Sequence, residues 1–481
     1  MSSAPVLDYT NMLAPSVGDV GVDPARLRGE ADLANRFREA HEAVERARDR
    51  GDLGFFDLPY DHETARRVRY VADGFGQWFE NLLVLGIGGS TLGTRALADA
   101  LLGPYWNETS GEGRDHFPRL YVLENVDPDT VARTLAELDL RRTLVNVVSK
   151  SGSTAETMAQ FLVLRSRLEE VVGEEEARGH LLLTTDPEKG ALRELAREEG
   201  IPALPVPPGV GGRYSVLSPV GLLPAAATGM DVDALLRGAA RMDERCRTPN
   251  LEENPAGLLA VLLYRAQQEE GQGTHVLMPY SDGLRSFSLW FQQLWAESLG
   301  KDRRDDTEGP DEGWPGSATP RDGRGTPTGP TPLPAVGATD QHSQVQLFME
   351  GPSDKVVVFV SVGEREDPVT LPDRHPGVGA FGYLGGHTME ELLDVERKAT
   401  EEALRQRGRP SMTLEIPRLD AETLGQLLML FQIGTVHAGA LYGVNPMDQP
   451  GVELGKELTY GLLGREGFEA PSLREEDRRR A

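Results

Sequence analysis

Two segments of the chain share one design, which constrains the fold more than any other feature. Each has a short apolar run, then a loop rich in glycine, serine and threonine, then a helical pattern; they span 81–93 and 143–157. Apolar runs of this length suit strands buried on both faces, and strand, loop and helix in succession are the repeating unit of parallel sheets. The design predicts an α/β fold.

The same alternation continues along the chain. Strand candidates at 82–85, 120–123, 144–148 and 181–184 alternate with helical stretches at 91–102, 128–138 and 154–171. A second set has strands at 275–278, 355–362 and 412–416 between helices at 256–270, 286–299 and 389–407. Alternation of this kind is typical of doubly wound parallel sheets with helices on both faces. We therefore expect two similar α/β units.

These patterns divide the chain into four predicted parts. A charged helical lead-in occupies 1–54, the two α/β domains occupy 55–240 and 241–420, and a C-terminal helical segment with a charged tail occupies 421–481. Residues 302–331 contain six glycines and five prolines with almost nothing to bury. Such a composition cannot repay its ordering entropy, so we expect a mobile surface insertion within the second domain, either a tolerated loop or a lid.

Charge and cysteine content exclude several classes of function. The 50 basic and 76 acidic residues give a net charge of −26, which repels nucleic acid and anionic membranes. The lone Cys246 excludes a disulfide framework, and neither a signal peptide nor an apolar run of about 20 residues is apparent. We expect a cytoplasmic protein in which any anionic substrate meets a local positive pocket. The acidity fits either a saline habitat or a need for solubility.

The two loops are candidate phosphate-binding loops. Glycines allow close approach to a ligand, hydroxyls donate hydrogen bonds, and a helix N-terminus attracts anions. Neither loop has the spacing of a dinucleotide fingerprint or a P-loop, so a small phosphorylated metabolite fits better. For either loop alone a purely structural role remains open. The candidate ligand-binding residues are Gly89, Ser90, Ser149, Lys150, Ser151 and Thr154.

Glu297 is the strongest candidate for a general base. Phe287, Trp290, Leu294 and Glu297 follow one another at spacings of three, four and three, so they share one helical stripe. A carboxylate that continues an apolar stripe is either a rim residue at the helix end or a partly desolvated base. A base of the second kind suits abstraction of a proton beside a carbonyl.

Three more residues are candidates for catalysis. Arg213 follows two glycines, His342 begins a helix among polar residues, and Lys456 lies just inside a late helix. The bland alternatives are a solvated arginine and a histidine that only makes hydrogen bonds. Sequence motifs for a metal site or a hydrolase nucleophile are absent. These residues suit proton transfer without a metal, and we expect no cofactor.

Six motifs occur in the order typical of one family. They are 86–90, 149–154, 212–215, 297–301, 340–343 and 449–456. On these motifs the chain resembles the glucose-6-phosphate isomerase family from about residue 80 to 456. The resemblance implies two sugar-isomerase (SIS-type) α/β domains, a homodimer with shared active sites, and reversible conversion of glucose 6-phosphate to fructose 6-phosphate through an enediol(ate), in glycolysis and gluconeogenesis.

The resemblance also implies a role for each matching residue. Glu297 would be the base, His342 and Lys456 would open the sugar ring, and Arg213 would stabilise the developing charge. Both loops would hold the phosphate, and Gln449 would line the sugar pocket. The second loop departs from the pattern of many members, which leaves the role of Ser153 open, and 302–331 is longer than expected.

Two other functions remain open at this stage. The chain could be a sugar-phosphate isomerase of broader specificity, such as one that also uses mannose 6-phosphate. It could also be a non-catalytic SIS-type sensor, although a sensor does not need Glu297, His342 and Lys456 together.

Overall fold

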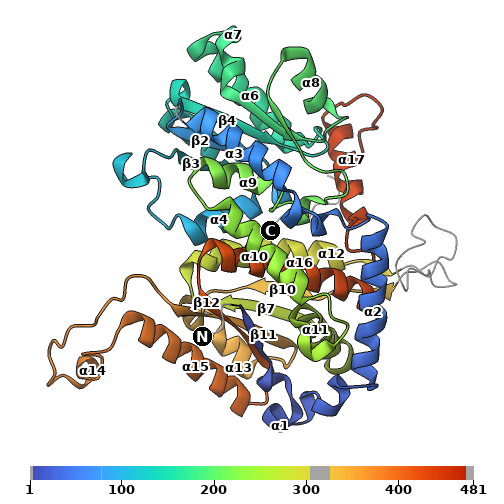
Figure 1. Cartoon of the computed structure of the whole chain (residues 1–481), viewed down its shortest axis with the longest axis vertical. Coiled ribbons are helices and arrows are strands. Elements are labelled where there is room, and N and C mark those ends of the chain that lie inside the picture. Colours follow the sequence, from blue (N-terminus) through green and yellow to red (C-terminus); the bar gives the residue numbers. More distant parts are fainter. Residues whose placement is uncertain (1–3, 77, 304–325, 473–481) are drawn as a thin grey trace.

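The structure is a computed structural model that describes residues 4–76, 78–303 and 326–472. Two five-stranded sheets, each flanked by helices, lie one above the other in Figure 1, with further helices between them. All neighbouring strands in the two sheets run parallel except at one edge. The predicted α/β class, with parallel sheets flanked by helices, is confirmed.

The first sheet has the strand order β3-β2-β4-β5-β6. Its strands are β2 (Asn81–Leu85), β3 (Arg119–Leu123), β4 (Thr143–Val148), β5 (Leu181–Thr185) and β6 (Ala203–Pro205). Along β2, Leu82 and Val84 enter the core between the two sheets, whereas Leu83 and Leu85 enter a separate core on the other face. Burial on both faces explains the uninterrupted apolar runs. Strand β6 was not predicted from the sequence, because it has only three residues and ends in proline.

Seven helices surround this sheet among the described residues. They are α3 (His62–Gly76), α4 (Leu92–Leu101), α5 (Pro128–Glu137), α6 (Ala155–Val172), α7 (Glu174–Ala177), α8 (Ala191–Glu199) and α9 (Pro219–Ala227).

The second sheet repeats this topology, with the order β1-β12-β11-β7-β10. Its strands are β1 (Val6–Asp8), β7 (Thr274–Pro279), β10 (Thr331–Pro334), β11 (Lys355–Glu364) and β12 (Ser411–Arg418). Among the parallel strands of each sheet, the first has the second on one side and the third on the other. The fifth position of the second sheet is taken by β1, which pairs antiparallel with β12.

Two sequence predictions need correction here. Residues 1–54 are not a purely helical lead-in, because β1 completes the second sheet; three residues are too few to show a strand pattern. The predicted insertion at 302–331 has ordered ends. Its β8 (Asp302–Arg303) pairs with β9 (Thr326–Pro327), and Thr331 begins β10. Of the prolines in this segment, Pro327 lies in β9, an edge strand, where proline is tolerated. Residues 304–325 lie outside the described residues.

The N-terminal part also contains α1 (Ala14–Val17) and α2 (Asp32–Asp49), and the second sheet is accompanied by further helices. These are α10 (Val232–Arg245), α11 (Pro255–Glu270), α12 (Arg285–Leu299), α13 (Val345–Glu350), α14 (Gly379–Gly382) and α15 (Met389–Gln406). The segment between β11 and α15, which contains α14, projects from the body as an arm, drawn in orange in Figure 1.

Helix α16 (Ala421–Tyr442) lies at the centre of the molecule rather than at its periphery. It crosses α10 so closely that a Cβ on Gly238 would lie 1.9 Å from the carbonyl oxygen of Glu422, and a Cβ on Gly425 would lie 2.0 Å from that of Leu235. Among the described residues, α16 is also the one helix long and apolar enough to cross a membrane, although its whole apolar window is buried inside the protein. We therefore interpret α16 as a core helix.

Helix α17 (Glu453–Leu462) is different, because residues 451–459 are all exposed. Its exposed side chains include Leu454, Leu458 and Leu462.

Candidate active site

The first sheet places both candidate phosphate loops beside each other, at the carboxyl ends of its strands. One loop follows β2 and the other follows β4, and these two strands are neighbours. The connection after β2 leads to β3 on one side, and the connection after β4 leads to β5 on the other. Ligands of doubly wound proteins bind at such a switch point, outside the carboxyl ends of the strands.

The second loop is closed by its own hydroxyl groups. Ser149 Oγ lies 3.0 Å from Thr154 Oγ1 and accepts a hydrogen bond of 3.1 Å from the Gly152 N–H. Ser151 Oγ lies 3.4 Å from Thr154 Oγ1. Thr154 is the N-cap of α6 but makes no side-chain cap bond there. The first N–H groups of this 18-residue helix therefore face the hydroxyl cluster, which suits an anion.

Lys150 is a half-buried cation in the same loop. Its Nζ donates to the carbonyl oxygens of Pro208, at 2.5 Å, and Val210, at 2.8 Å. Burial lowers the pKa of the ammonium group below its usual value. An ammonium has three donors, so one remains for a ligand. The contacts also tie the loop to the segment that leads to Arg213.

The first loop packs against the turn that contains Arg213. A Cβ on Gly89 would lie 2.3 Å from the carbonyl oxygen of Gly212, so only glycine fits there. Ser215 Oγ donates to the Gly89 carbonyl oxygen at 3.2 Å. Ser90 is half-buried, and its hydroxyl makes no hydrogen bond within the part of the chain that the structure describes. That hydroxyl is available to a ligand.

Glu297 ends the apolar stripe of α12. Phe287, Trp290 and Leu294 are buried, while the Glu297 side chain is 29% exposed. Its Oε2 accepts a hydrogen bond from Arg213 Nη1 at 3.0 Å and another from Gln293 Nε2 at 3.3 Å. The carboxylate is thus fixed by two donors and still open to solvent on one side, as a base that must reach a substrate requires.

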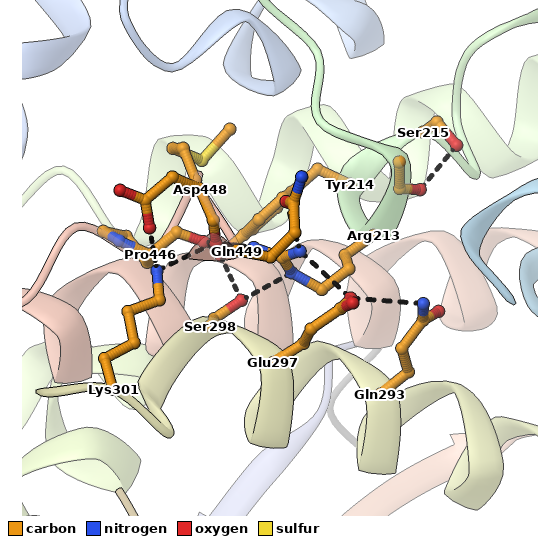
Figure 2. Close-up of polar contacts among 12 residues, drawn as sticks. Arg213, Tyr214, Ser215, Gln293, Glu297, Ser298, Lys301, Pro446, Asp448 and Gln449 are labelled. Atoms are coloured by element: carbon orange, nitrogen blue, oxygen red, sulfur yellow. Dashed lines mark hydrogen bonds and ion pairs between the residues drawn. The ribbon is translucent and has the colours of Figure 1, made fainter. Parts of the chain in front are cut away.

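Arg213 is the hub of the site, as Figure 2 shows. Its side chain is only 5% exposed, and Nε donates to Ser298 Oγ at 3.0 Å. Nη1 donates to Glu297 and, at 3.0 Å, to Gln449 Oε1. Nη2 donates to the carbonyl oxygens of Pro446, at 3.0 Å, and Asp448, at 2.9 Å. A guanidinium has five N–H donors, so every one is used within the protein.

A cleft of about 500 Å³ opens beside this hub. Glu297 from α12 and Lys301 just after it line one part of the cleft, and Gln449 with Gly451 and Val452 line another. Its size is in the usual range for a small-molecule site. Figure 2 shows Lys301 reaching toward the turn that carries Gln449.

The structure brings the predicted site residues into two connected groups and leaves two residues outside them. Arg213 contacts both Glu297 and Gln449, and its turn packs against the loop that contains Gly89 and Ser90. Ser149, Lys150, Ser151 and Thr154 form the second group.

His342 and Lys456 are both exposed. Lys456 Nζ pairs with Glu453 Oε1 at 2.7 Å, and the His342 side chain makes no hydrogen bond or ion pair among the described residues. Within one chain, neither residue contacts Glu297 in the described structure.

Sequence reasoning missed four residues that shape the site: Gln293, Ser298, Lys301 and Asp448. Gln293 lies one turn before Glu297 on α12, so helical spacing from Glu297 could have found it. Ser298 and Lys301 belong to the quoted motif around Glu297, yet only the fold reveals that they face Arg213 and Asp448.

Among the described residues, no group of three or more histidine, cysteine, aspartate or glutamate side chains could hold a metal ion.

The chain is similar to known proteins over most of its length. The family model "Phosphoglucose isomerase" matches residues 69–466. Glucose-6-phosphate isomerase of Carboxydothermus hydrogenoformans is 42% identical over 96% of this chain and 95% of its own. That of Rubrobacter xylanophilus is 46% identical over 87% of this chain and 90% of its own.

Two solved structures are also similar. A hypothetical protein of Thermus thermophilus superposes with a TM-score of 0.80 and 38% identity, over 96% of this chain and all of its own. A glucose-6-phosphate isomerase from Chlamydia trachomatis gives a TM-score of 0.70 and 27% identity, over 84% of this chain and 73% of its own.

The fold and the family match define an isomerase of phosphorylated sugars. With the matches above, the chain belongs to the phosphoglucose isomerase family.

Proposed function

We propose that the chain interconverts glucose 6-phosphate and fructose 6-phosphate by moving a proton between C1 and C2. The observation that carries the proposal is the Glu297 carboxylate, held at 3.0 Å by Arg213 on the wall of a cleft that Gln449 also lines. A positioned base beside a buried cation suits an enediol(ate) intermediate, in which negative charge develops on oxygen.

The phosphate would bind at the second loop and the start of α6. Ser149, Ser151 and Thr154 offer hydroxyl groups, Lys150 has one donor to spare, and the helix N-terminus adds further N–H groups. Ser90 would complete this site from the first loop. The phosphate takes no part in bond breaking, but holding it fixes the carbon chain against Glu297.

In the isomerisation step, Glu297 takes the proton from C2 of the open-chain aldose and returns it to C1. A proton moves from O2 to O1 in the same passage, so the atoms balance. Arg213 acts through its charge, because all its N–H groups are already used within the protein. A cation aimed at a developing oxyanion is worth about 3–4 kcal/mol.

Ring opening is the step assigned to His342 and Lys456. His342 is exposed and unpaired among the described residues, and Lys456 lies on the exposed helix α17. We propose a homodimer in which each site receives His342 from the neighbouring chain. Two features support a second copy of the chain. They are the leucines of α17 that face solvent and the projecting arm, whose exposed side chains include Val378, Phe381 and Tyr383.

The cytoplasm is the proposed location. The thiol of Cys246 is buried, and burial raises its pKa to about 12, so it is poorly reactive.

The test is a turnover assay with glucose 6-phosphate and fructose 6-phosphate after exhaustive chelation and dialysis. We expect interconversion in both directions without added metal. Absence of turnover with either sugar would refute the proposed function. Turnover that is lost on chelation and restored by a divalent metal would refute the metal-free mechanism. Adding mannose 6-phosphate to the assay measures the breadth of specificity.

A further inference from the structure

Lys301 follows Glu297 by one turn, where α12 has just ended. Its Nζ donates to the carbonyl oxygen of Asp448 at 2.9 Å, to Asp448 Oδ1 at 2.5 Å, and to the carbonyl oxygen of Asn445. An ammonium has three N–H donors, so all three are used. The side chain is 8% exposed. Lys301 therefore has no donor left for a substrate, although it lies on the wall of the cleft.

The acceptors of Lys301 belong to one short segment, the turn 445–449. Arg213 binds the same turn through the carbonyl oxygens of Pro446 and Asp448. Two buried cations thus hold three backbone carbonyl groups and one carboxylate of this turn. Lys301 approaches the turn from the end of α12, and Arg213, which also holds Glu297, approaches it from the turn at Gly212–Tyr214.

The turn matters because of what it carries. Gln449 ends it and receives a hydrogen bond from Arg213, and α17 with Lys456 begins four residues later. Among the described residues, α17 is exposed along most of its length, so this turn is the main attachment of its N-terminal end to the protein. The position of Gln449 and Lys456 relative to Glu297 thus depends on the turn.

We propose that Lys301, paired with Asp448, is a positioning residue that fixes the turn 445–449 and so sets Gln449 and Lys456 against Glu297. The effect on catalysis rests on the proposed function, whereas the effect on the turn does not. Burial lowers the pKa of the Lys301 ammonium, and the hydrogen bond to Asp448 opposes this shift. A misplacement of about 1 Å can cost about 10²-fold in rate, so a residue that holds this turn in place can have a large effect on kcat.

The first experiment compares Lys301→Met with a matched control, Lys355→Met. Lys355 is a similarly buried lysine, 10% exposed, paired with Asp354 at the start of β11. We expect Lys301→Met to lower kcat by about 10- to 100-fold with KM changed much less, because the phosphate loops are intact. Lys355→Met should keep the wild-type kcat. Equal kcat in Lys301→Met and wild type would overturn the proposal, as would equal losses in the two variants.

The second experiment does not depend on activity. Amide hydrogen exchange, measured without substrate, should be about tenfold faster or more at 445–460 in Lys301→Met, and unchanged there in Lys355→Met. Lys301→Arg, which keeps a cation and donors, should recover most of the protection. Unchanged exchange in Lys301→Met would show that Lys301 does not fix the turn 445–449, even if kcat fell.

A double-mutant cycle covers the case in which Lys301→Met folds poorly. Asp448→Asn changes a half-exposed residue and keeps its size. Asp448→Asn should lower kcat in the same direction, and the double variant should be no worse than Lys301→Met alone. Independent, additive losses would overturn the pairing. If the wild-type enzyme fails to convert the sugars, the proposed function is refuted. The exchange data still test whether Lys301 fixes the turn 445–449.

Discussion

Arg213 and Glu297 are 84 residues apart in the sequence and joined by a hydrogen bond of 3.0 Å in the structure. The same Arg213 nitrogen donates to Gln449, which is 236 residues away. Three segments thus meet at one atom: the turn after β6, the end of α12, and the turn before α17. A single guanidinium thus contacts both the proposed base, Glu297, and the Gln449 amide.

This relationship predicts a large effect for Arg213→Lys. An ammonium has three donors in place of five, so it cannot serve all the acceptors around Arg213. We expect kcat to fall by about 10²-fold or more. Steady-state kinetics measure it, with Arg265→Lys as the control, because Arg265 is an equally buried arginine paired with Glu269 and Glu270. An Arg213→Lys enzyme within about threefold of wild type would show that a cation at this position suffices and that the five-donor geometry of Arg213 is not required.

The phosphate loop gives a separate prediction. Replacing both Ser149 and Thr154 with alanine removes the hydroxyl pair at 3.0 Å and should weaken binding of substrate and of inorganic phosphate together. KM and the inhibition constant of phosphate are the measurements. Thr134→Ala, an exposed hydroxyl on α5, should change neither. If both constants stay at their wild-type values in the double variant, the loop is not the phosphate site.

The sequence predicted the elements better than their arrangement. The apolar runs located β2, β4 and β11 within a few residues, because strands buried on both faces are predominantly apolar. Short elements were missed: β1 and β6 have three residues each, too few for a pattern. Helix α16 was found, but its central place was not, because long-range packing decides which face of a helix is covered.

For the site as well, local sequence patterns were informative and long-range contacts were not predictable. Glu297 could be singled out from its place on an apolar stripe, which is local information. The network of Lys301 and Asp448 could not, because its partners are 147 residues apart and their contact depends on the fold. The exposed state of His342 within one chain was equally invisible, since a motif says nothing of which surface a residue faces.

Subunit complementation tests the shared site. His342→Ala and Glu297→Gln proteins should each be inactive, and mixing them after subunit exchange should restore part of the activity. A mixed dimer would hold one site with both wild-type residues. The control is each variant exchanged with itself. Proven exchange without recovered activity would mean that each chain supplies its own histidine.

The burial of His275 predicts that the stability of the protein depends on pH. It is fully buried beside Trp295, whose Nε1 donates to His275 Nδ1 at 3.0 Å, and burial lowers the pKa of His275 to about 3. In the unfolded chain the pKa is about 6.5, so only the unfolded state takes up this proton as the pH falls. The folded protein therefore loses about 1.4 kcal/mol per pH unit from about pH 6.5 down to about 3.

His275→Gln keeps an acceptor for Trp295 but cannot titrate. Denaturant unfolding between about pH 7 and pH 5 should show that the free energy of unfolding falls less steeply with pH in this variant. The difference in slope should be about that contributed by the uptake of one proton. Another buried histidine, His437, has its pKa lowered to about 3 by burial and remains in the variant, so some dependence should persist. Identical pH slopes for the two proteins would contradict the prediction.

The last prediction concerns the base itself. Glu297→Gln keeps the shape of the side chain and an acceptor for Arg213 Nη1 but removes the basic carboxylate. Substrate should still bind, since the phosphate loops are untouched, while the proton transfer between C1 and C2 should fall by about 10²- to 10⁴-fold. Ring opening, assigned to His342 and Lys456, should persist because it needs no proton from carbon. The test gives the variant fructose 6-phosphate in D₂O and follows deuterium at carbon and anomer interconversion by NMR.

Gln293→Ala is the companion variant: it removes the second donor to Glu297 but leaves the base, so deuterium should still enter at carbon. Deuterium entry at the wild-type rate in Glu297→Gln would show that another group is the base.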